Sequence, residues 1–291
     1  MDAVFGDAPA WRAPLQLFAG LHYLVLRGQA SWDDVGTALA EHGDFLRERV
    51  AAHGVQTNEL QRSWMLLPCF LEVVARTGAR ELDLVELGAS GGLNLLWDHF
   101  RYRYVEGTWG RHDACLELEG SERHAVPGDV LSPAPRVRSR VGIDVEPVDL
   151  TTDEGVAFVK SFVWADQTWR LDLLDRAVDA FRADPPRIVR GNLVDELPGV
   201  LARRDDEALM LVWQIAVFGY LTADERREAR NSLAHAGAEG PLALVEASRP
   251  ADGADDYYGL RIQVWPGGER VELAHGDWHG AWLDWLGAAA R

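Results

Sequence analysis

The sequence has few of the features that mark secreted, membrane-spanning or metal-dependent proteins. It holds two cysteines, Cys69 and Cys115, and no Cys-x-x-Cys pair, so neither a disulfide framework nor a zinc or redox motif is expected. It has no apolar run of about 18 residues, the length of a membrane-spanning helix. The N-terminus lacks the basic and apolar stretches of a signal peptide. These absences predict a cytoplasmic protein that binds no metal and enters no membrane.

Positive charge is also scarce. The 291 residues include 29 Lys and Arg against 46 Asp and Glu, which gives a net charge of −17. Because neutralisation of phosphates supplies most non-specific affinity for nucleic acid, this balance disfavours a nucleic-acid ligand. It disfavours anionic membrane surfaces in the same way. A small-molecule substrate is therefore expected, and assembly into a homo- or hetero-oligomer stays open.

The N-terminal part of the chain follows helical spacing. Leu15, Phe18, Leu21 and Val25 recur at helical intervals, and residues 13–80 show no strand signal. We therefore predict an N-terminal helical cap region over residues 1–80.

From residue 81 onward, short apolar runs alternate with helical patterns. Five runs predict strands, at residues 82–87, 141–143, 187–190, 209–213 and 242–246. Helices are expected at residues 93–100, after Thr152, around 171–181 and from Thr222 onward. Two more runs, 260–265 and 270–274, predict an antiparallel hairpin. The fold class is therefore α/β over residues 81–291, a Rossmann-like, mostly parallel sheet with a β-rich insertion at 101–135.

The first predicted strand ends in a glycine-rich turn, E-L-G-A-S-G-G at residues 86–92. Gly88 permits a sharp turn, and Gly91 and Gly92 leave the backbone open to a ligand at the N-terminus of the next helix. Ser90 breaks the dinucleotide fingerprint, and no Lys-Ser/Thr pair follows as in a P-loop. A glycine turn that only packs helix against strand would have the same sequence.

The acidic residue before the turn indicates a cationic ligand. Glu86 would repel a diphosphate but attract the ammonium and sulfonium groups of S-adenosylmethionine. The pattern E-x-G-x-G-x-G, with Ser90 at its middle glycine, is similar to the first motif of class I methyltransferases. Asp144 could hold the ribose hydroxyls or only cap its strand, and the amide oxygen of Asn192 could accept the adenine amino group. The predicted cofactor site comprises Glu86, Gly88, Ser90, Gly91, Gly92, Asp144 and Asn192.

Candidate catalytic and substrate-binding residues lie outside the turn. A general base is needed only when the acceptor starts protonated. The candidates for this role are Glu59, His22, Gln214 and His279, and the candidates for substrate contact are Gln56, Asn58, Arg190 and Trp213. Simpler roles are available, since Thr57 or Asn58 could cap a helix and His22 could belong to the core. Trp278, Trp282 and Trp285 recur at helical spacing, which favours a core or interface stripe.

From Leu15 to Leu286 the chain resembles the bacterial proteins grouped as domain of unknown function 2332. The match rests on residues 21–24, 56–59 with Arg62, 86–95, 142–144, 163–164 with 166–167, 187–192, 220–221 and 279–280 with Trp282 and Trp285. The resemblance implies a methyltransferase-like fold more firmly than an activity. This sequence departs from the family pattern at Asn192, usually Asp, at Gly91, commonly Ala, and at Trp213-Gln214, where a His-Ser pair is usual.

Three functions are compatible with these observations. The first is an S-adenosylmethionine-dependent methyltransferase acting on a small molecule. The second is a biosynthetic enzyme of the same fold that catalyses another displacement or elimination, such as closure of a small nitrogen ring, and has lost methyl transfer. The third is a non-catalytic subunit of a heteromer, which the 12 tryptophans favour.

Overall fold

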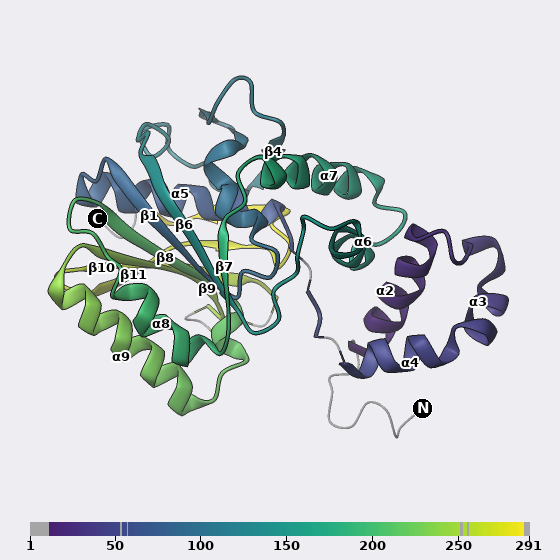
Figure 1. Ribbon diagram of the computed structural model, residues 1–291. Coiled ribbons are helices and arrows are strands. Elements are labelled where there is room, and N and C mark those ends of the chain that lie inside the picture. The colour runs from purple at the N-terminus through teal and green to yellow at the C-terminus, as the bar shows by residue number, and fades with distance from the viewer. Residues whose placement is uncertain (1–11, 53, 57, 251–252, 255, 288–291) are drawn as a thin grey trace. The chain divides into compact units, whose positions relative to one another are not determined.

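The computed structural model describes residues 12–52, 54–56, 58–250, 253–254 and 256–287 (Figure 1). Two compact units divide the chain, Met1–Asn58 with Val148–Arg182 and Glu59–Pro147 with Ala183–Arg291. The division falls at residue 59, whereas the sequence places a boundary at residue 80. Helix α5 (Gln61–Thr77) belongs to the second unit because it packs against strands of the sheet.

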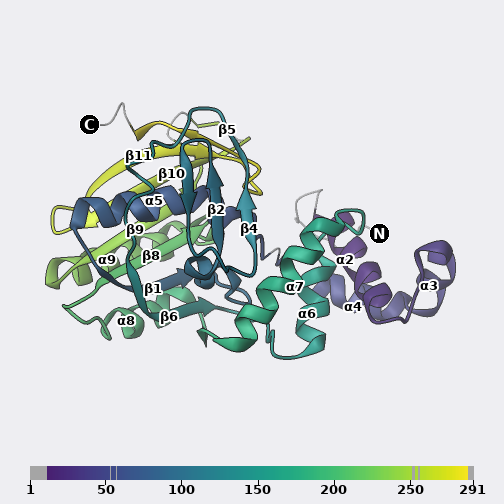
Figure 2. The same cartoon turned by 90° about the horizontal axis from the view of Figure 1, so that it is seen from above.

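The first unit is helical within its described residues (Figure 2). Its helices are α2 (Arg12–Leu26), η1 (Trp32–Asp34), α3 (Val35–Glu41), α4 (Gly43–Ala52), α6 (Asp153–Ser161) and α7 (Thr168–Ala183). Ser31 caps η1 and Thr152 caps α6 through their side-chain oxygens, as such residues do at helix N-termini. Leu24 and Leu46 belong to the small core between α2 and α4. The predicted N-terminal helices are therefore confirmed.

The second unit is built on a nine-stranded sheet with the order β5-β12-β11-β10-β9-β8-β1-β6-β7. Its parallel centre consists of β1 (Glu81–Leu87), β6 (Arg136–Asp144), β7 (Arg187–Arg190), β8 (Leu209–Ile215) and β9 (Leu242–Ser248). The antiparallel strands β10 (Tyr258–Trp265) and β11 (Glu269–Gly276) follow. The predicted α/β class, the parallel sheet and the terminal hairpin are confirmed.

The strand order reverses direction beside β1. The chain runs from β1 to β6 and β7 on one side, then returns to β8 and β9 on the other side. In open α/β sheets, ligands bind outside the carboxyl ends of the strands at such a switch point. The carboxyl ends of β1 and β8 carry Glu86 and Trp213, which are register neighbours.

Helices cover both faces of this sheet (Figure 1). On one face, Val85 and Leu87 of β1 pack in a core with α8 (Leu193–Leu201) and α9 (Ala223–Glu239). Because side chains alternate along a strand, Glu86 points to the opposite face, where Phe70 of α5 contacts the indole of Trp213. Coverage on both faces explains why residues 82–87 of β1 are all buried, the acidic Asp83 and Glu86 included.

The segment between β1 and β6 holds a second, three-stranded sheet inside the predicted insertion. Its strands are β2 (Arg101–Tyr104), β3 (Gly107–Trp109) and β4 (Glu117–Glu119), in the order β3-β2-β4. Before it, the helix predicted at residues 93–100 is the 3₁₀ helix η2 (Leu93–His99). A 3₁₀ helix of this length aligns few peptide dipoles, so the expected helix N-terminus at the glycine turn is only weakly formed.

The C-terminal tryptophans do not form the predicted helical stripe. Trp282 and Trp285 lie in strand β12 (Trp282–Trp285), which pairs with β11 and with β5 (Ser121–Glu122). Backbone pairing with these distant strands overrides the helical spacing of the side chains. None of the helices in the described ranges combines the length and apolarity needed to cross a membrane.

Candidate functional site

The glycine turn after β1 is bound to the end of β6. The N–H groups of Gly88 and Ala89 both donate to the carbonyl oxygen of Ile143, at 2.8 and 3.2 Å. The N–H of Ser90 donates to Oδ2 of Asp144 at 2.7 Å. Ser90 has a φ of 50°, a left-handed conformation that residues other than glycine rarely adopt. The turn and Asp144 therefore form one hydrogen-bonded unit.

Two glycines of the turn are required by packing inside the protein. Gly88 has a φ of 74° and Gly92 a φ of 80°. A Cβ at Gly88 would lie 2.2 Å from Cγ2 of Val217, and one at Gly92 would lie 2.7 Å from Cδ1 of Ile188. Gly91 lies between Ser90 and Gly92 and is buried. The interpretation of the turn as a packing feature accounts for Gly88 and Gly92 without a ligand.

Glu86 is a buried carboxyl group at the switch point, 4% exposed. Burial, with a smaller effect of the charge of Asp144, raises its pKa to about 8, although Trp213, Asn94 and Arg62 act in the opposite direction. Within the described part of the chain, Oε2 of Glu86 and Nε1 of Trp213 lack a hydrogen-bond partner of ordinary geometry. The site thus presents a largely neutral carboxyl group with an unsatisfied oxygen.

Asp144 uses both of its oxygens to hold backbone. Oδ2 accepts from Ser90, and Oδ1 accepts from the N–H of Glu146 at 2.9 Å. A carboxylate offers about four acceptor positions, so Asp144 retains capacity for other donors. Its register neighbour on β7 is the exposed Arg190. Asn192 caps α8 by accepting from the N–H of Val194 at 2.9 Å, so its amide oxygen already has a donor.

A second group of polar residues gathers at the start of α5. Oε2 of Glu59, which is buried, lies 3.6 Å from Nδ1 of the exposed His279. The Nε of Arg62 donates to the carbonyl oxygen of Trp278 at 2.8 Å. A Cβ at Gly280 would lie 2.4 Å from the carbonyl oxygen of Gln61. This close approach brings two predicted catalytic residues, Glu59 and His279, together.

The first turn of α5 links this group to Glu86. Ser63 donates through Oγ to Oδ1 of Asn94 at 2.8 Å, and Asn94 in turn stabilises the charged form of Glu86. The charge of Arg62 acts on Glu86 in the same direction. Sequence reasoning about candidate residues did not find Ser63 or Asn94; their only signal was their place inside or beside the segments that carry the family resemblance.

Gln214 lies on the other face of β8 from Trp213. It is fully buried, and its Oε1 accepts from the N–H of Phe218 at 3.3 Å. Its register neighbour Glu246 contacts Arg230 at 2.6 Å and Arg270 at 2.8 Å. The strand alternation therefore separates Gln214 from Glu86, although both lie near the carboxyl ends of neighbouring strands.

Three predicted residues belong to the first unit. His22 is buried, its Nδ1 donates to the carbonyl oxygen of Val163 at 2.9 Å, and burial lowers its pKa. These contacts account for His22 as a core residue. Gln56 is half-buried and Asn58 is buried with a φ of 34°. Helix α5 begins at Gln61 after Leu60, so Asn58 does not cap it, and Thr57 lies outside the described residues.

The family model for uncharacterized proteins conserved in bacteria, DUF2332, matches residues 3–285. The chain belongs to this family. A comparison with curated proteins finds no match. Among solved structures, an S-adenosylmethionine-dependent methyltransferase from Clostridium acetobutylicum ATCC 824 matches with 12% identity and a TM-score of 0.28, covering 82% of this chain and 78% of that chain. The DUF2332 match spans both the glycine turn and the start of α5.

Among the residues that the structure describes, no group of three or more His, Cys, Asp or Glu side chains is arranged to hold a metal ion. The polar side chains described above, at the carboxyl ends of the parallel strands and at the start of α5, offer carboxyl, imidazole, indole and guanidinium groups. They belong to Glu59, Arg62, Glu86, Asp144, Trp213 and His279.

An Asp144→Ala variant of the DUF2332 protein should unfold more easily by about 1–3 kcal/mol, because the N–H groups of Ser90 and Glu146 lose their acceptor. Asp144→Asn keeps one acceptor oxygen and should lose less. Urea denaturation measures both. Asp113→Ala, which removes an exposed surface carboxylate, is the control and should change stability by less than about 0.5 kcal/mol. Equal losses at positions 113 and 144 would contradict the role of Asp144 in holding the turn.

Proposed function

We propose that this protein is an S-adenosylmethionine-dependent methyltransferase acting on a small molecule. The observation that carries the proposal is the buried carboxyl group of Glu86 at the switch point, with an unsatisfied oxygen. A cationic ligand at this place would favour the ionised carboxylate and supply the missing partner. The net charge of −17 also favours cations over anionic ligands.

The residues present fit the polar ends of this cofactor. Glu86 would hold its ammonium or sulfonium group, and the remaining acceptor positions of Asp144 would receive ribose hydroxyls. When bound, the sulfonium supplies an activated methyl group, so the protein mainly has to align the acceptor. His279, whose Nδ1 lies 3.6 Å from Oε2 of Glu59, can take a proton from a protonated acceptor.

A second candidate is a displacement or elimination that transfers no methyl group. It is favoured by the packing of Val217 and Ile188 against Gly88 and Gly92, because this packing accounts for both glycines without a bound cofactor. In that function Glu86 binds an amine of the substrate itself. In a ring closure, the nitrogen of this amine would form a bond to carbon as the bond from that carbon to the leaving group breaks. The leaving group would depart with the bonding electron pair, and His279 would accept the proton from the nitrogen.

Calorimetric titration with S-adenosylmethionine and S-adenosylhomocysteine separates the two candidates. Binding of either compound at pH 7 should release close to one proton, because a pKa of about 8 leaves the free Glu86 largely protonated. Repeating the titration in buffers of different ionisation enthalpy measures this proton. Glu86→Gln should release none and should bind at least about tenfold more weakly, a loss of about 1.4 kcal/mol.

Glu119→Gln is the matched control, since Glu119 is an exposed carboxylate on β4. It should retain both the affinity and the proton release of the parent protein. Absence of binding at millimolar ligand would reject the methyltransferase proposal in favour of the second candidate. Binding without proton release would instead remove Glu86 from the cofactor site.

A further inference from the structure

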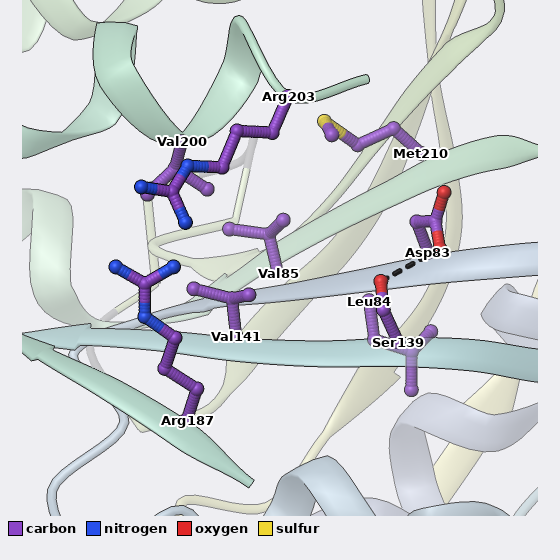
Figure 3. Close-up of a pocket in the computed structure, with 9 residues that line it drawn as sticks. All are labelled: Asp83, Leu84, Val85, Ser139, Val141, Arg187, Val200, Arg203 and Met210. Carbon is purple, nitrogen blue, oxygen red and sulfur yellow. Dashed lines mark hydrogen bonds between the residues drawn. The ribbon is translucent and has the colours of Figure 1, made fainter. Parts of the chain in front are cut away.

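A small cavity lies on the face of the sheet opposite to Glu86 (Figure 3). Its volume is about 40 Å³, and its apolar wall includes Val85 of β1, Val141 of β6 and Val200 of α8. Two arginines stand at one end, Arg187 at the start of β7 and Arg203 just after α8. The cavity is therefore separate from the site at the carboxyl ends of the strands, and an inference about it does not depend on the proposed function.

The two guanidinium groups are turned toward one another in Figure 3. Both arginines are exposed, and within the described residues neither side chain makes an ion pair or a hydrogen bond. The acidic residues next to Arg203 in the sequence form ion pairs with other arginines, Asp205 with Arg138 and Asp206 with Arg204. Two facing cations without an anion repel each other, and this occurs in a chain with 46 acidic residues.

The position of Arg203 alone has an ordinary explanation, but the convergence of Arg187 on the same place does not. A cation after the last turn of α8 is favoured by the helix dipole, which accounts for Arg203. Arg187 lies on a different element and directs the same kind of group at the same place. Arginine presents a planar fork of donors that matches carboxylate and phosphate oxygens.

We propose that this cavity binds a small oxyanion, a phosphate or carboxylate group, between Arg187 and Arg203. A water molecule needs about 10–15 Å³ of such space, so 40 Å³ accommodates a group of a few heavy atoms. The one carboxylate of the cavity, Asp83, lies at the end away from the arginines and accepts from Oγ of Ser139 at 2.6 Å (Figure 3). The anion is thus the terminal group of a small ligand, with any short apolar part against the valines.

Titration of the full chain with inorganic phosphate and with acetate tests this site. Thermal melting and calorimetry are carried out at constant ionic strength, with chloride as the balancing anion. Phosphate, acetate or both should bind saturably, at least tenfold more weakly to Arg187→Gln and to Arg203→Gln, and with no saturable response in the double variant. Arg227→Gln removes an exposed arginine that pairs with Asp224 and should bind like the parent protein.

The outcomes distinguish the source of the oxyanion. Binding of phosphate alone identifies a phosphorylated ligand, and binding of acetate alone or of both identifies a site that accepts carboxylates. Because the two arginines repel, the melting temperature of either ligand-free single variant should not fall. No saturable binding to the parent protein, or an unchanged response in the double variant, would overturn the proposal.

Discussion

A Glu86→Gln variant should be more stable than the parent protein at pH 9, by about 3–5 kcal/mol, and equally stable near pH 4. The pKa of this carboxyl rises from 4.5 to about 8 on burial, and a tenfold change in an acid dissociation constant corresponds to about 1.4 kcal/mol. Glutamine has a similar shape but cannot ionise. The difference between the two proteins therefore measures how strongly the site resists a charge at position 86.

The direction in which the stability of the parent protein changes with pH follows from proton binding by Glu86. Below pH 4.5 the folded and unfolded states both hold the proton, so Glu86 makes no pH-dependent contribution. Between pH 4.5 and about 8 the unfolded chain releases the proton while the folded state keeps it, so stability falls as pH rises. Above pH 8 both states are ionised and the loss is constant.

Urea denaturation at a series of pH values from 4 to 9 measures this difference. Glu119→Gln, at an exposed position, should run parallel to the parent protein over the whole range. If the Glu86→Gln and parent curves were also parallel, Glu86 would be ionised in the folded state. A saturating cationic ligand should reduce the difference at pH 9, because the ligand supports the carboxylate form of the parent protein alone.

A Gly88→Ala variant should lose about 3 kcal/mol of stability. The left-handed backbone at φ 74° costs about 1–2 kcal/mol for any residue with a Cβ, and the added methyl would collide with Cγ2 of Val217. Adding Val217→Ala removes the colliding atom, after which the nearest atom of residue 217 is its Cβ at 3.4 Å. The double variant should then recover at least about 1 kcal/mol relative to the sum of the single changes.

Gly78→Ala is the matched control for this experiment. Gly78 has a φ of 67°, and no atom lies within 4 Å of the position that its Cβ would take. It should therefore show the backbone cost alone, about 1–2 kcal/mol, and Val217→Ala should not improve it. Equal losses at positions 78 and 88 would show that packing does not require Gly88, which would favour a role in ligand binding.

Local patterns were sufficient to predict most of the framework. Gly28 and Gly78 end helices, Thr152 and Thr222 begin them, and the hairpin flanks residues 266–268 as expected. Helix α8 was not predicted, although Asn192 and the acidic residues after it form a recognisable N-terminal signal. Pro198 inside this helix weakens the helical pattern of so short a segment.

Less of the site could be predicted from the sequence, because the chemistry of its side chains depends on their burial in the fold. Ser90 and Asp144 were expected in one cofactor site, and their contact follows from the pairing of β1 with β6. The raised pKa of Glu86 instead depends on the burial of its carboxyl group in the folded protein. The contact of Glu59 with His279 joins the start of α5 to a C-terminal loop, and no local pattern connects segments so distant in the chain.

The two edge strands, or margins, of the nine-stranded sheet affect how copies of this protein can associate. One margin is β5, with two residues, and the other is β7, a four-residue strand with arginine at both ends. Short, charged margins offer little template for a further strand from another molecule. Growth of this nine-stranded sheet across molecules is therefore disfavoured at both margins, and we expect any self-assembly to use other surfaces.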